Sequence, residues 1–187
     1  MPSILDGLPR TQAELQKAHL ASAIQFGEIV AQADLTARSR SIIDAMGEGL
    51  SLGDVLGITR EERDALLVHG FRQLQQGDAA GAQVTLTQLY HIEPMDERVI
   101  YALAATYQAQ EQYAAAAKLY LCFLAYDATN PQGYLRIAEC FLAAREYPEA
   151  EAYIEAARVQ AAGSACEADV DRHAGALSAA IPARPAA

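Results

Sequence analysis

The sequence predicts an all-α protein in which three helical hairpins stack side by side, with a helical arm before them and a capping helix after them. Three observations support this fold class. Apolar residues recur at helical spacing, and no segment alternates apolar and polar residues as a half-buried strand does. Small residues recur every 34 residues without a gap, and turn signals fall at the same interval.

The period is clearest at two positions that hold only small residues. The first position holds Gly70, Ala104 and Ala138, and the second holds Ala82, Ala116 and Ala150. Large apolar residues recur beside them: Leu86, Tyr120 and Ile154 at one position, and Leu66, Ile100 and Tyr134 at another. Two helix backbones approach closely where side chains are small, so this pattern predicts the contact inside each hairpin.

The spacing matches tetratricopeptide repeats over 63–96, 97–130 and 131–164, which together form a short right-handed superhelix. An irregular helical bundle with chance similarity is the alternative, and the agreement of several kinds of position at one period argues against it. One unit cannot bury its own faces, so stacked neighbours must cover them.

The expected turns fall at the same register in each unit, at 76–78, 111–113 and 145–147. Gly77 suits a left-handed helix cap. Pro94 and Pro131 stand at helix boundaries, where proline is tolerated.

The flanks of the repeats divide into shorter segments. Residues 1–10 are predicted to be a disordered lead, and 11–57 a helical region, with a helix from Thr11 to about Ala45. A glycine-containing stretch and a short turn at Asp54–Gly57 precede the repeat domain, 58–164. Residues 165–181 are expected to form a helix that caps the open end of the stack, and 182–187 a loose tail.

Composition limits the class of partner. The formal net charge is −10, and Lys17 and Lys118 are the two lysines, so nucleic acid and anionic membranes are poor partners. No signal peptide and no membrane-spanning run is expected. The three cysteines lie far apart, which favours buried thiols in a reducing cytoplasm.

No constellation for catalysis, cofactor binding or metal binding is found. Gly49–Gly53 matches the GxSxG pattern of hydrolases, but that motif needs a strand-to-helix turn, and no strand precedes it. A small hydrolase therefore remains as an alternative through this motif alone, and a glycine-rich hinge is favoured. The four histidines, His19, His69, His91 and His173, share no metal-ligand spacing. The protein is predicted not to be an enzyme.

The first helix of each stacked unit is expected to line a concave groove that binds a partner. Candidate residues for binding a partner peptide are Leu67, Val68, Phe71, Leu74, Arg98, Tyr101, Ala105, Leu135 and Arg136. The groove lacks the lysines and asparagines with which some tetratricopeptide adaptors bind a terminal carboxylate, so an extended, partly apolar peptide is the expected ligand. Alternatively, Leu67 and Phe71 pack against the N-terminal helix.

Several segments together resemble a known family. They are Gly49–Leu56 (GLSLGDVL), Gly70–Asp78 (GFRQLQQGD), Asp96–Arg98 after Pro94, Ala138–Leu142 (AECFL) and Pro148–Ala152 (PEAEA). With three repeats behind an N-terminal helical segment, they resemble the class II chaperones of bacterial type III secretion. The resemblance covers about residues 45–165.

The resemblance implies a function. Such chaperones are cytoplasmic, need no ATP, and keep two hydrophobic translocator proteins soluble and unassembled before export. They bind an extended translocator segment in the groove, here at Leu67, Phe71, Leu74 and Tyr101, although family members often have tyrosine in place of Leu67 and Leu74. A homodimer through the N-terminal region is also implied. A general scaffold or regulatory adaptor, such as a transcription co-regulator, is the second hypothesis.

Overall fold

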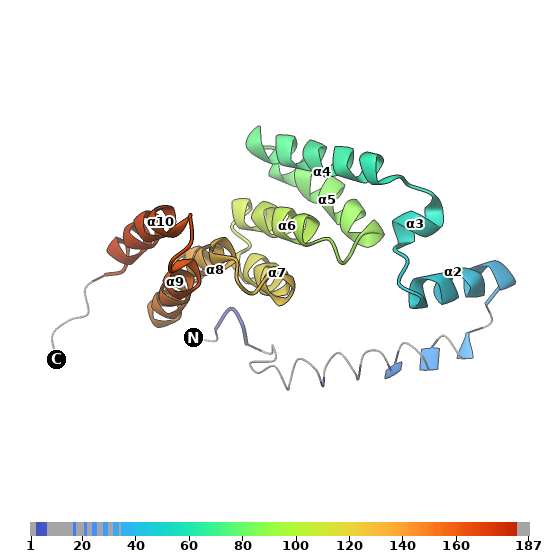
Figure 1. Cartoon of the computed structure of the whole chain (residues 1–187), viewed down its shortest axis with the longest axis horizontal. Coiled ribbons are helices and arrows are strands. Elements are labelled where there is room, and N and C mark those ends of the chain that lie inside the picture. Colours follow the sequence, from blue (N-terminus) through green and yellow to red (C-terminus); the bar gives the residue numbers. More distant parts are fainter. Residues whose placement is uncertain are drawn as a thin grey trace.

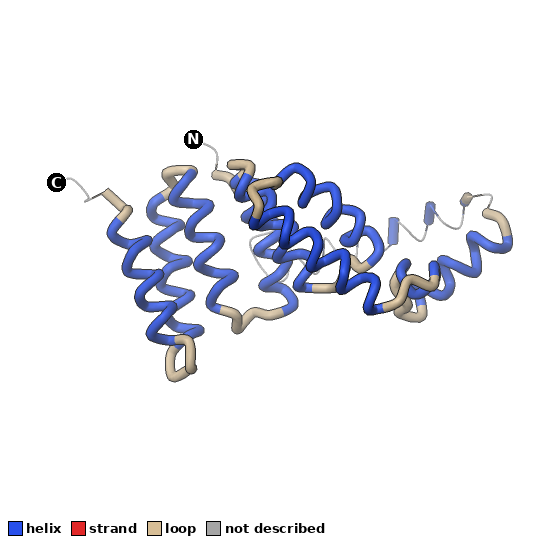
Figure 2. The backbone as a smooth tube through the Cα atoms, turned by 90° about the horizontal axis from the view of Figure 1, so that it is seen from above, coloured by secondary structure: helices blue, strands red, loops and turns tan. Residues whose placement is uncertain are grey.

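The computed structural model describes residues 3–6, 17, 21, 24–25, 28–29, 32–33 and 35–182. Every regular element in this part of the chain is a helix (Figures 1 and 2). The helices are α2 (Ala37–Gly47), α3 (Leu52–Leu56), α4 (Arg60–Gln75), α5 (Ala79–Ile92), α6 (Glu97–Ala109), α7 (Tyr113–Tyr126), α8 (Pro131–Ala143), α9 (Tyr147–Ala161) and α10 (Glu167–Ala179).

The helices form the stack of hairpins that the period predicts. α4 packs on α5, α6 on α7 and α8 on α9, and α10 packs on both helices of the last hairpin. Neighbouring hairpins meet where α5 contacts α6 and where α7 contacts α8. The first helices of successive units also touch: α4 contacts α6, and α8 contacts α10. The all-α fold class with tandem hairpins is therefore confirmed.

The close approach inside each hairpin explains the small residues. Ala104 and Ala116 of the second hairpin are both fully buried, with 0% of their surface exposed. A Cβ on Gly70 would lie 2.7 Å from side-chain atoms of Leu86, closer than carbon atoms can pack. The helices of the first hairpin therefore cross at a point where only glycine fits without a shift of Leu86.

The core continues from one hairpin to the next and then into α10. Tyr120 and Phe141 are the largest fully buried side chains, and they lie in the cluster shared by the second and third hairpins. Val170 and Ala174 of α10 are also fully buried, in a cluster with Leu135 and Ile154. The buried face of α10 thus covers the end of the stack, as a terminal helix of a repeat protein must.

The turns inside the hairpins share a left-handed backbone residue. Gly77, Glu111 and Arg145 have φ values of 83°, 60° and 62°, and they stand 34 residues apart. A left-handed residue at the end of a helix satisfies the last carbonyl groups through the amides that follow. The fold therefore imposes one backbone conformation at this position, whether or not the residue is glycine.

The N-terminal arm differs from the single helix expected between Thr11 and about Ala45. Most of residues 11–34 lie outside the described residues. Thr36 has an extended backbone, with ψ 155°, and its Oγ1 accepts a hydrogen bond from the Ser39 amide at 3.1 Å. A helix begins anew after Thr36, because its side chain caps α2 instead of continuing an earlier helix. No residue of α2 is buried.

The predicted disordered lead, residues 1–10, is wrong for the part that the structure describes. Ser3–Asp6 forms a turn, and the Ile4 amide donates a hydrogen bond to Glu146 at 2.9 Å. Ile4 and Leu5 pack against the central core cluster, and Figure 1 shows this end of the chain beside the last hairpins. Pro2, Gly7 and Pro9 favoured disorder in this segment, but Ile4 and Leu5 supply an apolar contact that holds the turn in place. Residues 183–187, most of the predicted tail, lie outside the described residues.

A larger side chain at the close approach should destabilise the stack. We expect Ala104→Leu to lower the free energy of unfolding by about 1–3 kcal/mol, because the core around α6 and α7 is filled. Ala114 is exposed on α7, so Ala114→Leu is the matched control and should change stability by no more than about 0.5 kcal/mol. Urea unfolding followed by circular dichroism measures both. Equal effects would mean that the helices do not approach as closely as described.

The left-handed turn position gives a second prediction, in which the free energy of unfolding changes in opposite directions at two repeats. Gly77→Ala should destabilise the protein by about 1 kcal/mol, since an L-residue is strained at positive φ. Glu111→Gly should stabilise it by roughly 0.5–1 kcal/mol, because the strain of Glu111 exceeds the added freedom of the unfolded chain. The same unfolding measurement checks both variants. A stabilising Gly77→Ala would contradict the backbone conformation.

Candidate peptide-binding groove

The candidate site is a hollow on the face formed by the first helices of the units. Its volume is about 500 Å³, and residues of α4, α6, α7 and α8 surround it. The lining residues are Leu74, Ala105, Gln108, Ala109, Tyr113, Tyr120 and Arg136. Three hairpins therefore contribute to one concave site, as expected for a groove along stacked repeats.

Small residues on α6 create the hollow. Ala105 and Ala109 lie four residues apart, so they share one face of the helix and leave space above it. Leu74 and Tyr113 supply apolar walls from the first and second hairpins. Gln108 and Arg136 add polar groups to an otherwise apolar lining. Such a mixture suits a peptide segment that buries an apolar side chain and whose main chain also needs hydrogen-bond partners.

A polar network connects the hairpins beside the hollow. Glu139 of α8 accepts hydrogen bonds from Gln108 Nε2 at 2.6 Å and from Arg136 Nη1 at 2.9 Å. Arg136 Nε also donates to the Tyr101 hydroxyl at 3.2 Å, and the Tyr120 hydroxyl donates to Gln108 at 2.8 Å. These bonds join α6, α7 and α8, so the polar groups of the hollow are fixed before any partner arrives.

Burial and charge set the protonation of these groups. Burial alone would lower the pKa of Arg136, but the hydrogen bond to Tyr101 and the charge of Glu139 outweigh it and raise that pKa. Burial raises the pKa of Tyr120 above its ordinary value and that of the Cys140 thiol to about 12. The arginine is therefore a permanent cation, and the thiol stays protonated at neutral pH.

The structure places four of the nine predicted contact residues at the hollow or directly beside it. Leu74, Ala105 and Arg136 line the hollow itself, and Tyr101 binds Arg136. Phe71 is partly buried beside the first hairpin's core, and Val68 is 47% exposed.

The structure buries two of the predicted contact residues. Leu67 is 6% exposed and packs with Leu86 and Leu103, and Leu135 is fully buried beside Ile154. The period assigns the fifth position of each unit to the groove, but in these two units that side chain enters the core between helices. The alternative that Leu67 and Phe71 pack against an N-terminal helix is not what the described residues show, because their partners come from α5, α6 and α7.

Arg98 lies in a separate ion-pair group. Its Nη2 contacts Asp64 at 2.9 Å and Asp96 at 2.7 Å, and 49% of its side chain is exposed. Asp64 and Arg98 occupy the same position of successive repeats, 34 residues apart. Arg98, which was predicted to contact the peptide, is thus paired with two neighbouring carboxylates.

Sequence reasoning missed Ala109, Tyr113, Tyr120 and His173 as parts of the site. Tyr113 occupies the repeat position that is often aromatic, so the period offered a signal for it. His173 lies in α10, outside the repeats, and its Nε2 stands 2.8 Å from Glu139. No periodicity could have placed that side chain beside the groove.

The GxSxG segment has a structural role. Ser51 caps α3, and its Oγ accepts a hydrogen bond from the Asp54 amide at 3.1 Å. Arg63 joins this cap to the first hairpin by contacting Asp54, at 2.9 Å, and Glu93. α3 lies where a turn was expected at Asp54–Gly57, and the left-handed Gly57 ends it. No strand precedes the serine among the described residues, so the nucleophile geometry is absent there.

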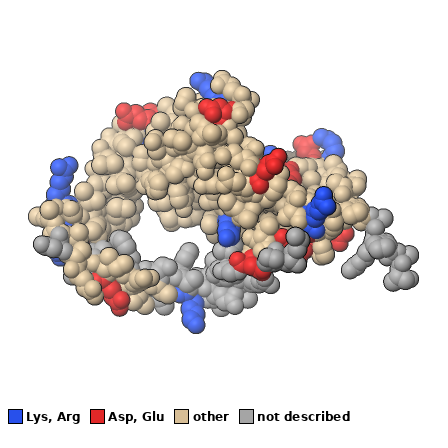
Figure 3. Space-filling view, turned by 180° about the vertical axis from the view of Figure 1, so that it is seen from behind, with Lys and Arg blue, Asp and Glu red and all other residues tan. Residues whose placement is uncertain are grey.

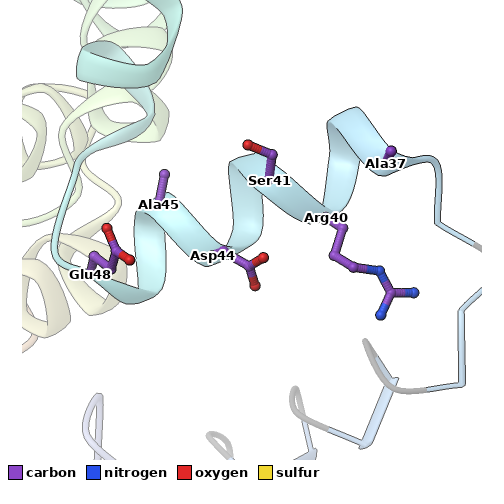
Figure 4. A pocket seen from close by; sticks show the side chains of 6 residues that line it. All are labelled: Ala37, Arg40, Ser41, Asp44, Ala45 and Glu48. Atoms are coloured by element: carbon purple, nitrogen blue, oxygen red, sulfur yellow. The ribbon is translucent and has the colours of Figure 1, made fainter.

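A second hollow lies along α2, and the described residues that line it belong to that helix and its C-cap. Figure 4 shows its side chains, which are Ala37, Arg40, Ser41, Asp44, Ala45 and Glu48. They follow one polar face of the helix and do not converge on a point, so they offer no enclosed binding site. On the face shown in Figure 3, acidic and basic side chains are scattered and form no basic patch.

The described residues show neither a metal-binding cluster nor a membrane-spanning helix. They include no group of three or more histidine, cysteine, aspartate or glutamate side chains arranged to hold a metal ion. None of their helices has the length and apolar character needed to cross a bilayer.

Solved structures provide the comparison with known proteins. No protein-family model and no curated protein sequence matches the chain. The translocator chaperone SycD of Yersinia enterocolitica is 25% identical, with a TM-score of 0.65 over 69% of this chain and 97% of SycD. PcrH of Pseudomonas aeruginosa is 27% identical, with a TM-score of 0.61 over 66% of this chain and 93% of PcrH.

These neighbours include complexes with peptides. PcrH bound to the chaperone-binding region of PopD is 28% identical, with a TM-score of 0.62 over 66% of this chain and 94% of PcrH. SycD has been solved with a peptide of the translocator YopD, and it also forms a dimer. The comparisons confirm the resemblance that the repeat layout indicates, and the chain has the fold of the class II translocator chaperones of type III secretion.

Proposed function

We propose that this protein is a bacterial cytoplasmic chaperone that binds hydrophobic type III translocators and keeps them soluble and unassembled before export. A short extended segment of the translocator occupies the groove. The observation that carries the proposal is the hollow above Ala105 and Ala109, with Leu74 on one side and Arg136 on the other. The neighbours PcrH and SycD, which share this fold, bind translocator segments.

The binding energy comes from apolar burial on a fixed surface. An apolar side chain of the partner in the hollow contributes roughly 1.5–3 kcal/mol, and two or three such side chains are needed to offset the cost of ordering the segment. Arg136 offers a hydrogen bond to the partner's main chain without a new charge, since Glu139 neutralises it. We expect this binding to need no nucleotide. The site residues of this proposal are Val68, Phe71, Leu74, Tyr101, Ala105 and Arg136.

The neighbours do not favour the alternative of a general scaffold or regulatory adaptor. They are chaperones and not enzymes. The acidic surface of this chain, with its net charge of −10, also suits a protein partner better than nucleic acid.

Co-expression tests the proposed function. A hydrophobic translocator candidate from the same gene cluster should be insoluble alone and should be recovered in a soluble complex when this chain is present. A translocator that stays insoluble, with no complex recovered, would contradict the chaperone function.

A charge in the hollow should abolish that recovery. Leu74→Asp places a carboxylate against the apolar lining, and we expect it to weaken binding of the translocator segment at least about tenfold. Val84 is 61% exposed on α5, so Val84→Asp is the matched control and should bind normally. Fluorescence anisotropy with a labelled translocator peptide measures affinity, and circular dichroism verifies the fold. Normal binding by Leu74→Asp would place the site elsewhere.

The N-terminal arm supports a homodimer. α2 buries none of its residues, yet it carries Ile42, Ile43 and Met46, and Met46 is 42% exposed. An exposed apolar side chain such as Met46 is what a second copy would cover. We expect Met46→Glu to convert the dimer to a monomer without loss of helicity, as measured by light scattering after gel filtration. An unchanged mass would remove α2 from the dimer contact.

A further inference from the structure

α10 contacts the polar network beside the groove through His173. His173 Nε2 stands 2.8 Å from Glu139 Oε1, while the other oxygen, Oε2, accepts from Gln108 and Arg136. Both oxygens of one carboxylate are therefore occupied, by groups from three helices. The Glu139 side chain is 18% exposed and the His173 side chain 35%. Residues 165–181 were predicted to act as a cap, and this contact gives α10 a second role.

The docking of α10 does not depend on this histidine. Val170 and Ala174 are fully buried against Leu135 and Ile154 and supply the apolar anchor. Loss of the imidazole should therefore leave α10 in place and release only the carboxylate. The His173–Glu139 hydrogen bond therefore links α10 to the groove, and the fold does not require it.

Glu139 in turn determines where Arg136 lies. Arg136 uses Nε for Tyr101 and Nη1 for Glu139, and Nη2 takes part in no hydrogen bond among the described residues. Because Arg136 lines the hollow, this amino group can donate to a carbonyl oxygen of a segment bound there. The paired charges of Arg136 and Glu139 cancel, so an uncharged acceptor is preferred over a carboxylate.

We propose that α10 forms part of the peptide site and that His173 is a positioning residue, which holds Glu139 and through it keeps Arg136 and Gln108 in place for the partner segment. This inference rests on the proposed function, because it concerns the same groove. The histidine touches no partner atom in this arrangement, and it acts through the carboxylate.

The first test needs no partner. Arg136 Nε–H is hydrogen-bonded to Tyr101, so its exchange with water should be slow and measurable by NMR in the full-length protein, with Arg136→Lys to assign the signal. His173→Ala should speed this exchange roughly 5–30-fold, as expected when a charge-assisted hydrogen bond that supports the arginine is lost. His173→Gln can still donate to Glu139 and should restore slow exchange.

The second test uses a fluorescein-labelled peptide of the co-expressed translocator, mapped on a tiled array. His173→Ala should weaken its binding roughly 5–30-fold with a nearly unchanged melting temperature, and His173→Gln should recover most of the affinity. Arg172 is the matched control on α10, since its side chain is 77% exposed and pairs with Asp169 of the same helix. Arg172→Ala should bind like the wild type.

The outcomes separate the two proposals. If the wild type binds no translocator peptide, the proposed function fails, and faster exchange in His173→Ala still supports the positioning of Arg136. If exchange and affinity in His173→Ala both match the wild type, the positioning role is overturned, whatever the partner. If His173→Gln behaves like His173→Ala, the hydrogen bond to Glu139 is not the cause and the proposal is overturned as well.

Discussion

The close approach of two helices inside each hairpin is the constraint on which the rest of the structure depends. Gly70 leaves no room for a Cβ beside Leu86, and the equivalent alanines of the later units are completely buried. With the pair of helices fixed at this distance, the large residues beside them must fill the space toward the next unit. The curvature of the stack, and with it the groove, follows from repeating that geometry.

Polar bonds between neighbouring units then determine the surface of the groove. Asp64 pairs with Arg98, and Gln108 with Glu139, in each case across the junction of two hairpins. Such bonds add little stability at an exposed surface. The Gln108–Glu139 bond also holds two polar groups in one arrangement beside the apolar hollow, which lowers the ordering cost when a partner binds.

The sequence predicted the helices, the turns and the small residues well, because these depend on contacts that recur at a fixed interval. It predicted the groove residues less well. Leu67 and Leu135 share a repeat position with Tyr101, yet a leucine fits between the helices and the larger tyrosine stays partly exposed, bound to Arg136. Which way a side chain turns depends on the neighbouring unit and not on the period. The turn at Ser3–Asp6 and the place of His173 depend on tertiary contacts between the third repeat and segments outside the repeats, so no local pattern encodes them.

The docked turn at Ile4 has a consequence for how the molecule is assembled. Contacts within and between adjacent hairpins join residues near in sequence, and such contacts form rapidly. The bond from Ile4 to Glu146 joins positions 142 residues apart. During synthesis the first residues leave the ribosome long before their docking site on the third hairpin exists. The N-terminal turn therefore cannot dock before the third hairpin has formed, and its docking reports that the three hairpins are in place.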